Sequence, residues 1–83
     1  MQYSKPNFCA LRRQIGFNIK DLRLNKNLSL EELSQRSAVD LLYIHKLERG
    51  KYTPELYTLL RLSCGLNVSL KRLFRKTGSF VNK

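Results

Sequence analysis

Basic and hydroxyl side chains gather in one short stretch of the chain, Arg49-Gly50-Lys51-Tyr52-Thr53. Guanidinium, ammonium and hydroxyl groups are the donors that proteins commonly direct at phosphate oxygens. The stretch lies between two predicted helices, and the N-terminal amides of the second helix could add a further phosphate contact. The sequence therefore predicts a phosphate-binding loop, with a solvated basic loop as the alternative.

The net charge favours the same kind of partner. Sixteen Lys and Arg residues against six Asp and Glu residues give a formal charge of +10. Such an excess indicates a polyanion, either nucleic acid or an anionic membrane, more strongly than a merely basic surface. Most of the acids have a structural place at predicted helix starts, where they complement the helix dipole; these are Glu31, Glu32, Asp40 and Glu55. Little acid remains to neutralise the basic surface, so nucleic acid is the favoured partner.

Catalytic and metal-binding patterns are missing from the sequence. His45 is the single histidine, and no paired base and nucleophile accompany it. Cys9 and Cys64 lack metal-ligand or redox spacing, so we expect two reduced thiols in the cytoplasm. No stretch approaches the roughly 20 apolar residues that span a bilayer. We therefore predict no enzyme activity, no cofactor, no metal site and no membrane partner.

The elements that would position the basic loop are short helices. Apolar residues recur at helical spacing over 9–26 and predict a first helix, with Asn27 as its left-handed cap. Gly16 interrupts this helix and is tolerated if a neighbouring helix packs closely there. Ser29 and Glu32 form an S-x-x-E capping box, which opens a second helix that ends near residue 37.

Three more helices follow in the prediction. Asp40 is the N-cap of a third helix over Leu41 to Arg49. Thr53 and Pro54 predict the start of a fourth, as N-cap and first-turn proline, and it runs to about Leu66. A short fifth helix then begins at residue 69. The predicted parts of this compact all-α fold are an N-terminal arm at 1–8, one domain at 9–76 and a basic C-terminal tail at 77–83.

The segment 28–50 reads LSLEELSQRSAVDLLYIHKLERG and contains an ordered pattern of two crossing helices. Its apolar seam, which fixes the crossing angle, consists of Leu33, Val39, Ile44 and Leu47. The pattern strongly resembles the lambda-repressor/Cro-like helix-turn-helix family, closest in style to short stand-alone phage or plasmid repressors and restriction-modification controller proteins. The likeness extends from about Ile15 to Phe74. It implies a five-helix DNA-binding domain with its helix-turn-helix at about 29–49.

The resemblance also implies which residues touch DNA. A helix-turn-helix places its second helix in the major groove. The residues on the outer face of that helix, which we expect to read bases, are Leu41, Leu42, His45 and Lys46. The residues expected at the phosphates are Ser29, Tyr43, Arg49, Lys51, Tyr52 and Thr53. Arg23 and Glu48 are expected to form a structural ion pair between the first and third helices.

Two features depart from the family pattern. Ala38 occupies the turn position that is usually glycine, and a positive φ there would cost on the order of 1 kcal/mol. Leu30, Leu41 and Leu42 stand where polar residues are common. Apolar side chains can contact the thymine methyl but cannot make bidentate hydrogen bonds to a base. An exposed leucine pair could instead dock a protein partner.

These observations predict a bacterial or phage-encoded, nucleoid-associated transcriptional regulator that binds double-stranded DNA. We expect it to act as a homodimer on a palindromic operator, since one small domain reads few base pairs. The expected dimer interface includes Val68, Leu70 and Phe74, with Phe80 or Val81 as further candidates. The alternative function is an antitoxin or adaptor that uses the same fold to bind a protein.

Overall fold

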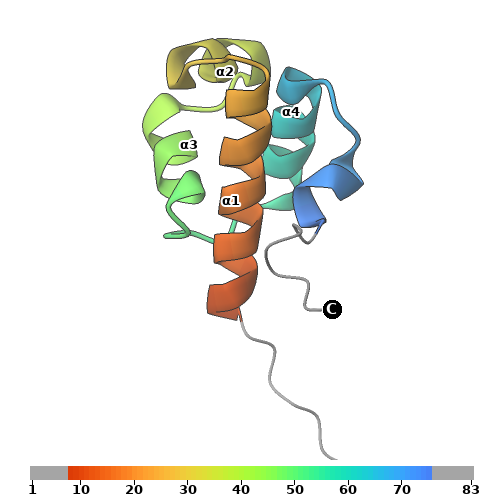
Figure 1. Cartoon of the computed structure of the whole chain (residues 1–83). Helices are drawn as coiled ribbons and strands as arrows, with labels where there is room; N and C mark the ends of the chain where they lie inside the picture. The colour runs from red at the N-terminus through yellow and green to blue at the C-terminus, as the bar shows by residue number, and fades with distance from the viewer. Residues whose placement is uncertain (1–7, 76–83) are drawn as a thin grey trace, which may run out of the picture.

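The computed structural model of the chain describes residues 8–75 (Figure 1). Its elements are α1 (Phe8–Asn25), α2 (Leu30–Ser37), α3 (Leu41–Glu48), α4 (Leu56–Leu66) and the 3-10 helix η1 (Leu70–Phe74). The all-α prediction is confirmed for this part of the chain. One correction is needed, because four α-helices are present where five helices were expected, and the predicted short fifth helix is the 3-10 helix η1. The predicted tail, and the predicted arm up to residue 7, lie outside the described residues.

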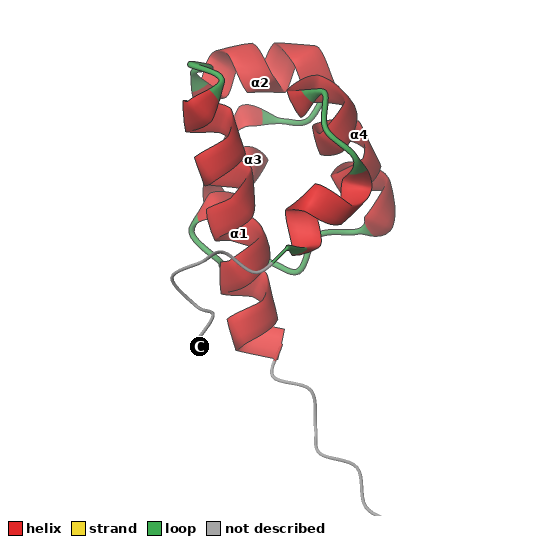
Figure 2. Cartoon of the chain, turned by 45° about the vertical axis from the view of Figure 1, so that its right-hand side comes forward, coloured by secondary structure: helices red, strands yellow, loops and turns green. Residues whose placement is uncertain are grey.

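The long helix α1 runs through the middle of the molecule, with α3 on one side and α4 on the other (Figure 1). Helix α2 lies across one end of this arrangement and packs on both α3 and α4 (Figure 2). Every helix contributes to a single core, whose buried apolar residues are Ile15, Ile19, Leu22, Leu28, Leu33, Val39, Ile44, Leu47, Leu59, Leu62, Leu66 and Leu73. The four residues predicted for the seam of the helix pair all belong to it.

Side-chain caps begin α2 and α3 at the predicted residues. The Ser29 hydroxyl accepts from the Glu32 amide at 3.0 Å, and the Glu32 carboxylate accepts from the Ser29 amide at 2.7 Å. The Asp40 carboxylate accepts from the Tyr43 amide at 3.1 Å. These bonds satisfy amides that the first turn of a helix leaves without a partner, so the two short helices begin at fixed residues.

The predicted start of α4 is wrong. The helix begins at Leu56 with Glu55 as its N-cap and without a side-chain capping bond. Thr53 and Pro54 remain in the preceding loop, where they line an apolar hollow together with side chains of α1 and η1. The local preference of a Thr-Pro pair to open a helix is therefore not realised here, and the helix begins two residues later than Pro54.

The last element is a single 3-10 turn. Its backbone bond from the Arg72 amide to the Ser69 carbonyl spans three residues, at 3.0 Å. The buried Asn18 side chain of α1 donates to the carbonyls of Leu73, at 2.9 Å, and Arg75, at 2.6 Å. Those carbonyls are thus satisfied from α1, while Leu73 enters the core, and a longer helix is not needed to satisfy them.

Helices α1 and α3 approach one another very closely at Gly16, which meets the condition under which a glycine is tolerated inside the first helix. A Cβ atom added to Gly16 would collide with the carbonyl oxygen of Leu47 and press on that of Glu48. The backbones therefore meet without an intervening side chain, which brings the solvent-facing side of α1 directly beside the C-terminal end of α3.

Candidate nucleic-acid interface

The turn between α2 and α3 is closed by side chains as well as by backbone bonds. Ala38 has φ 58° and ψ 34°, and its amide donates to the Ser34 carbonyl at 2.8 Å. The Ser34 hydroxyl donates to the Val39 carbonyl at 2.6 Å, and Arg61 of α4 donates to the Ala38 carbonyl at 3.1 Å. The turn therefore holds the left-handed conformation even though its central residue carries a Cβ atom.

Arg23 and Glu48 form an ion pair that joins α1 to the end of α3. The guanidinium donates to both carboxylate oxygens, at 2.7 and 3.0 Å, and also to the Leu28 carbonyl at 2.9 Å. The exposed fraction of each side chain is small, 10% for Arg23 and 4% for Glu48. The hydrogen bond to Glu48 raises the pKa of Arg23 above its already high value. The guanidinium thus stays charged at any ordinary pH, and α3 is fixed against both α1 and the start of α2.

The opposite side of α3 faces solvent. Ile44 and Leu47 are fully buried, whereas Leu42 is 63% exposed. His45 and Lys46 are exposed one turn later, and Leu41 is half-buried. The four residues predicted for base reading therefore share the outer half of the helix, with Leu42 the most prominent and Leu41 the least.

The predicted phosphate-binding residues divide into groups. Tyr43 and Tyr52 bring their ring centroids to 6.0 Å, and the Lys46 ammonium lies 5.6 Å from the centre of the Tyr52 ring. These three side chains line a hollow of about 450 Å³ to which Thr53 also contributes. Lys51 is exposed in the same loop. Ser29 lies apart, at the start of α2, and Arg49 lies at the C-terminal end of α3.

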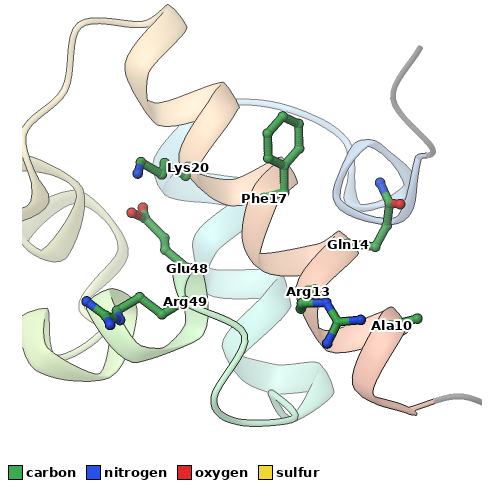
Figure 3. Close-up of a pocket in the computed structure, with 7 residues that line it drawn as sticks. All are labelled: Ala10, Arg13, Gln14, Phe17, Lys20, Glu48 and Arg49. Carbon is green, nitrogen blue, oxygen red and sulfur yellow. The ribbon is translucent and has the colours of Figure 1, made fainter. Parts of the chain in front are cut away.

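Two sets of surface residues escaped the sequence analysis. Arg13 and Lys20 of α1 line a second hollow together with Arg49, as Figure 3 shows. Their seven-residue separation along a helix was the available signal, but nothing in the sequence said that α1 lies beside α3. Leu56 and Leu60 of α4 are also exposed. Their signal was that α4 carries more apolar positions than one buried face requires.

The predicted dimer-interface residues have different environments. Val68 and Leu70 are half-buried and pack against the core of their own chain, whereas Phe74 is 43% exposed. Phe74 and Leu56 line the apolar hollow of about 240 Å³ at the junction of α1, α4 and η1. The exposed apolar surface of this region therefore centres on α4 and Phe74, and Val68 and Leu70 contribute less to it than expected.

The described residues contain no helix that is both long and apolar enough to cross a membrane. Within residues 8–75, no three side chains of His, Cys, Asp or Glu are grouped so that they could hold a metal ion.

The capped α2–α3 pair, its seam and its closed turn define a helix-turn-helix domain. A family described as helix-turn-helix matches residues 19–73, and the chain belongs to this family. It is 37% identical over 67 residues to an "Uncharacterized HTH-type transcriptional regulator y4dJ" of Sinorhizobium fredii, covering 81% of this chain and 87% of the relative. It is 31% identical over 71 residues to "Control protein C.SmaI" of Serratia marcescens, covering 86% and 84%.

Among solved structures, the restriction-modification controller protein C.AhdI from Aeromonas hydrophila is similar, with a TM-score of 0.76 and 32% identity. The match covers 78% of this chain and 98% of that protein. A hypothetical transcription factor, NHTF from Neisseria, superposes with a TM-score of 0.79 at 24% identity, which is a likeness of fold alone. The resemblance to helix-turn-helix controller proteins that the sequence predicted is confirmed.

Proposed function

We propose that this chain regulates transcription by binding a palindromic site in double-stranded DNA as a homodimer. The observation that carries the proposal is the contrast between the two sides of α3. One side is fixed by the core and by the Arg23–Glu48 pair, and the other exposes Leu42, His45 and Lys46. A helix held in this way can enter the major groove without losing its orientation. The similarity to a transcriptional regulator and to a control protein supports the same function.

Base reading on this helix combines one charged and two apolar side chains. The Lys46 ammonium can donate to guanine O6 and N7, and Leu42 can contact the C5 methyl group of thymine. His45 lies beside Lys46 and can donate or accept. Leu41 is half-buried, so we assign it a smaller share of base contact than Leu42.

Phosphate contacts would hold this helix in the groove. The loop after α3 presents Lys51, Tyr52 and Thr53 to solvent, and Tyr43 lies against Tyr52 on the same side. Ser29 begins α2 and would add a contact from a different element, as Arg49 would from the end of α3. Such contacts carry no sequence information, but they fix the register of the protein on the duplex.

The second copy would bind over α4 and η1. Leu56 is 60% exposed and Leu60 and Phe74 are 43% exposed, which is a large apolar surface for one small domain. Pairing by a two-fold axis would bury these residues against their own equivalents. It would also place two α3 helices about 34–36 Å apart, on successive major grooves of one face of the DNA.

The test is selection of bound duplexes from a random-sequence pool, followed by affinity measurements on the selected site and on an unrelated duplex. We expect the selected site to be palindromic. Leu42→Ala should relax the preference at one thymine-containing position, at about 1–3 kcal/mol. Lys51→Ala should weaken binding to both duplexes alike and lower the salt dependence. Arg36→Ala, which removes an exposed cation on α2, is the control for charge.

Failure of the wild-type protein to bind any duplex at low salt would contradict the proposal. Loss of a protein partner in Leu41→Ala or Leu42→Ala, with DNA binding absent or unchanged, would favour the adaptor function instead.

A further inference from the structure

Besides the hollow that Tyr43, Lys46 and Tyr52 line, another hollow lies between the C-terminal end of α3 and α1 (Figure 3). Its volume is about 450 Å³. Three cationic side chains line it, Arg13 and Lys20 from α1 and Arg49 from the end of α3. The aliphatic stem of Arg13 passes close to Gly50, where an added Cβ atom would lie 2.9 Å from the Arg13 Cγ atom.

The charge of this hollow is not neutralised from within. Arg13, Lys20 and Arg49 are all exposed, and none of them takes part in an ion pair within residues 8–75. The one acid in the lining is Glu48, whose two carboxylate oxygens are held by Arg23 and whose side chain is 4% exposed. The hollow therefore presents three cations to solvent and almost no negative charge.

The two hollows lie on opposite flanks of α3. Successive residues of an α-helix are turned by about 100°. With Leu42 as the outermost point, Tyr43 and Lys46 are turned by about 100° and 40° to one side, toward the loop that carries Tyr52. Glu48, the last residue of α3, is turned to the other side by about 120°. The exposed face of α3 is thus bordered on one flank by the hollow that Tyr43, Lys46 and Tyr52 line. On the other flank it is bordered by the cationic hollow, which Arg13, Lys20 and Arg49 line.

Helix α1 is close enough to serve as the second border. The contact at Gly16 joins the two backbones directly, so no side chain separates the outer face of α1 from the end of α3. Arg13 and Lys20 are two turns apart on that face, or about 10 Å along the helix axis. The two cations are therefore spaced along a line beside the exposed face of α3.

We propose that the hollow formed by Arg13, Lys20 and Arg49 is a second phosphate-binding surface, which contacts the DNA strand opposite the one contacted by the loop at 51–53. The proposal rests on the proposed function. The major groove is about 12 Å wide and a helix with its side chains is about 10–12 Å across, so a helix in the groove lies between the phosphates of both strands. Each flank of α3 then meets one row of phosphates, and each flank carries cations.

The experiment measures the salt dependence of DNA binding by the full chain and by Lys20→Gln and Arg13→Gln, which keep most of each side chain. Each variant should lower the slope of log affinity against log salt by about 0.9 for the phosphate contact removed. Between 50 and 200 mM salt, each variant should then lose about 3.5-fold less affinity than the wild type, which is that slope applied to a fourfold change in salt. The change should be the same for the selected site and for an unrelated duplex, and Arg36→Gln, at an exposed position of α2, should leave the slope unchanged.

The outcomes separate this proposal from the proposed function. If Lys51→Ala lowers the slope and Lys20→Gln and Arg13→Gln do not, DNA binding stands and the second phosphate-binding surface is rejected. If the two variants keep the DNA slope but lose binding to an acidic protein, the hollow is a protein-docking surface and the proposal is overturned. If the wild type binds no DNA, both proposals fall. Thermal melts of both variants should match the wild type, since the two side chains are exposed.

Discussion

The helix-turn-helix half of the molecule and its α4–η1 half are stabilised by different means. Both helices of the helix-turn-helix begin with a side-chain capping bond, at Ser29 and Asp40. Neither α4 nor η1 has one. The first half is also crossed by the Arg23–Glu48 pair, whereas the second half exposes Leu56 and Leu60.

This difference matches what each half is proposed to do. Hydrogen bonds and ion pairs are directional, so they fix the angle at which α3 leaves the domain. Apolar contact is not directional, and an apolar surface can be completed by a second molecule. The capping bonds and the ion pair thus lie where orientation matters, and the exposed side chains of Leu56, Leu60 and Phe74 lie where a second copy would bind.

Breaking the Arg23–Glu48 pair should have the largest effect on stability. Arg23→Ala leaves a buried carboxylate without its partner and is expected to cost about 3–5 kcal/mol in the free energy of unfolding. Thermal and chemical melts measure this loss. The double variant Arg23→Met with Glu48→Leu removes both charges and should recover much of it. Losses that simply add in a cycle with Glu48→Ala would show that the two residues do not interact.

Placing a charge on the exposed face of α4 should affect assembly and not folding. Leu60 is 43% exposed in the single chain, so pairing could add about 1 kcal/mol of burial per copy, which Leu60→Asp removes while it places a charge in the proposed interface. Sedimentation at several concentrations should then show a monomer with an unchanged melting profile in dilute solution. Leu24→Asp, at an exposed position on α1, is the control. A Leu60→Asp protein that sediments like the wild type would contradict the proposed interface.

Asn18 provides the polar connection between α1 and the C-terminal half. Asn18→Ala removes the donor to the Leu73 and Arg75 carbonyls and should cost about 1–3 kcal/mol, because the Leu73 carbonyl is left without its partner. Chemical denaturation measures the cost. Gln14→Ala should cost less, since Gln14 donates to the Arg75 carbonyl, which keeps its bond from Asn18. Equal costs would mean that the buried bond to Leu73 contributes little.

The smallest effect is expected in the turn, and it is a gain. Ala38 has φ 58°, a conformation that glycine adopts without the steric cost of a Cβ atom. Ala38→Gly should therefore stabilise the domain by about 0.5–1 kcal/mol, which for a domain of this size corresponds to an increase of several degrees in Tm. The comparison is Ser37→Gly, in the last turn of α2, which removes the hydroxyl that donates to the Leu33 carbonyl and should lower Tm. A lower Tm for Ala38→Gly as well would show that the turn gains nothing from glycine.

Local sequence was sufficient wherever one short segment contains both partners of an interaction. The capping box of Ser29 and Glu32, the Asp40 cap and the left-handed Asn27 were all predictable. The periodicity of apolar residues likewise predicted the seam of the helix pair. These features join residues at most a few positions apart, so their geometry follows from the helix itself.

The remaining features of the fold and of the surface depend on contacts between residues that are distant in sequence. The end of η1 is held by hydrogen bonds from Asn18 of α1 to the carbonyls of Leu73 and Arg75. The cationic hollow depends on Gly16, which lets α1 approach the end of α3 and brings Arg13 and Lys20 beside Arg49. The sequence by itself thus determined the helices, their caps and the family. Only the tertiary structure decided which charges and apolar side chains share a surface, because that depends on contacts between helices and not within them.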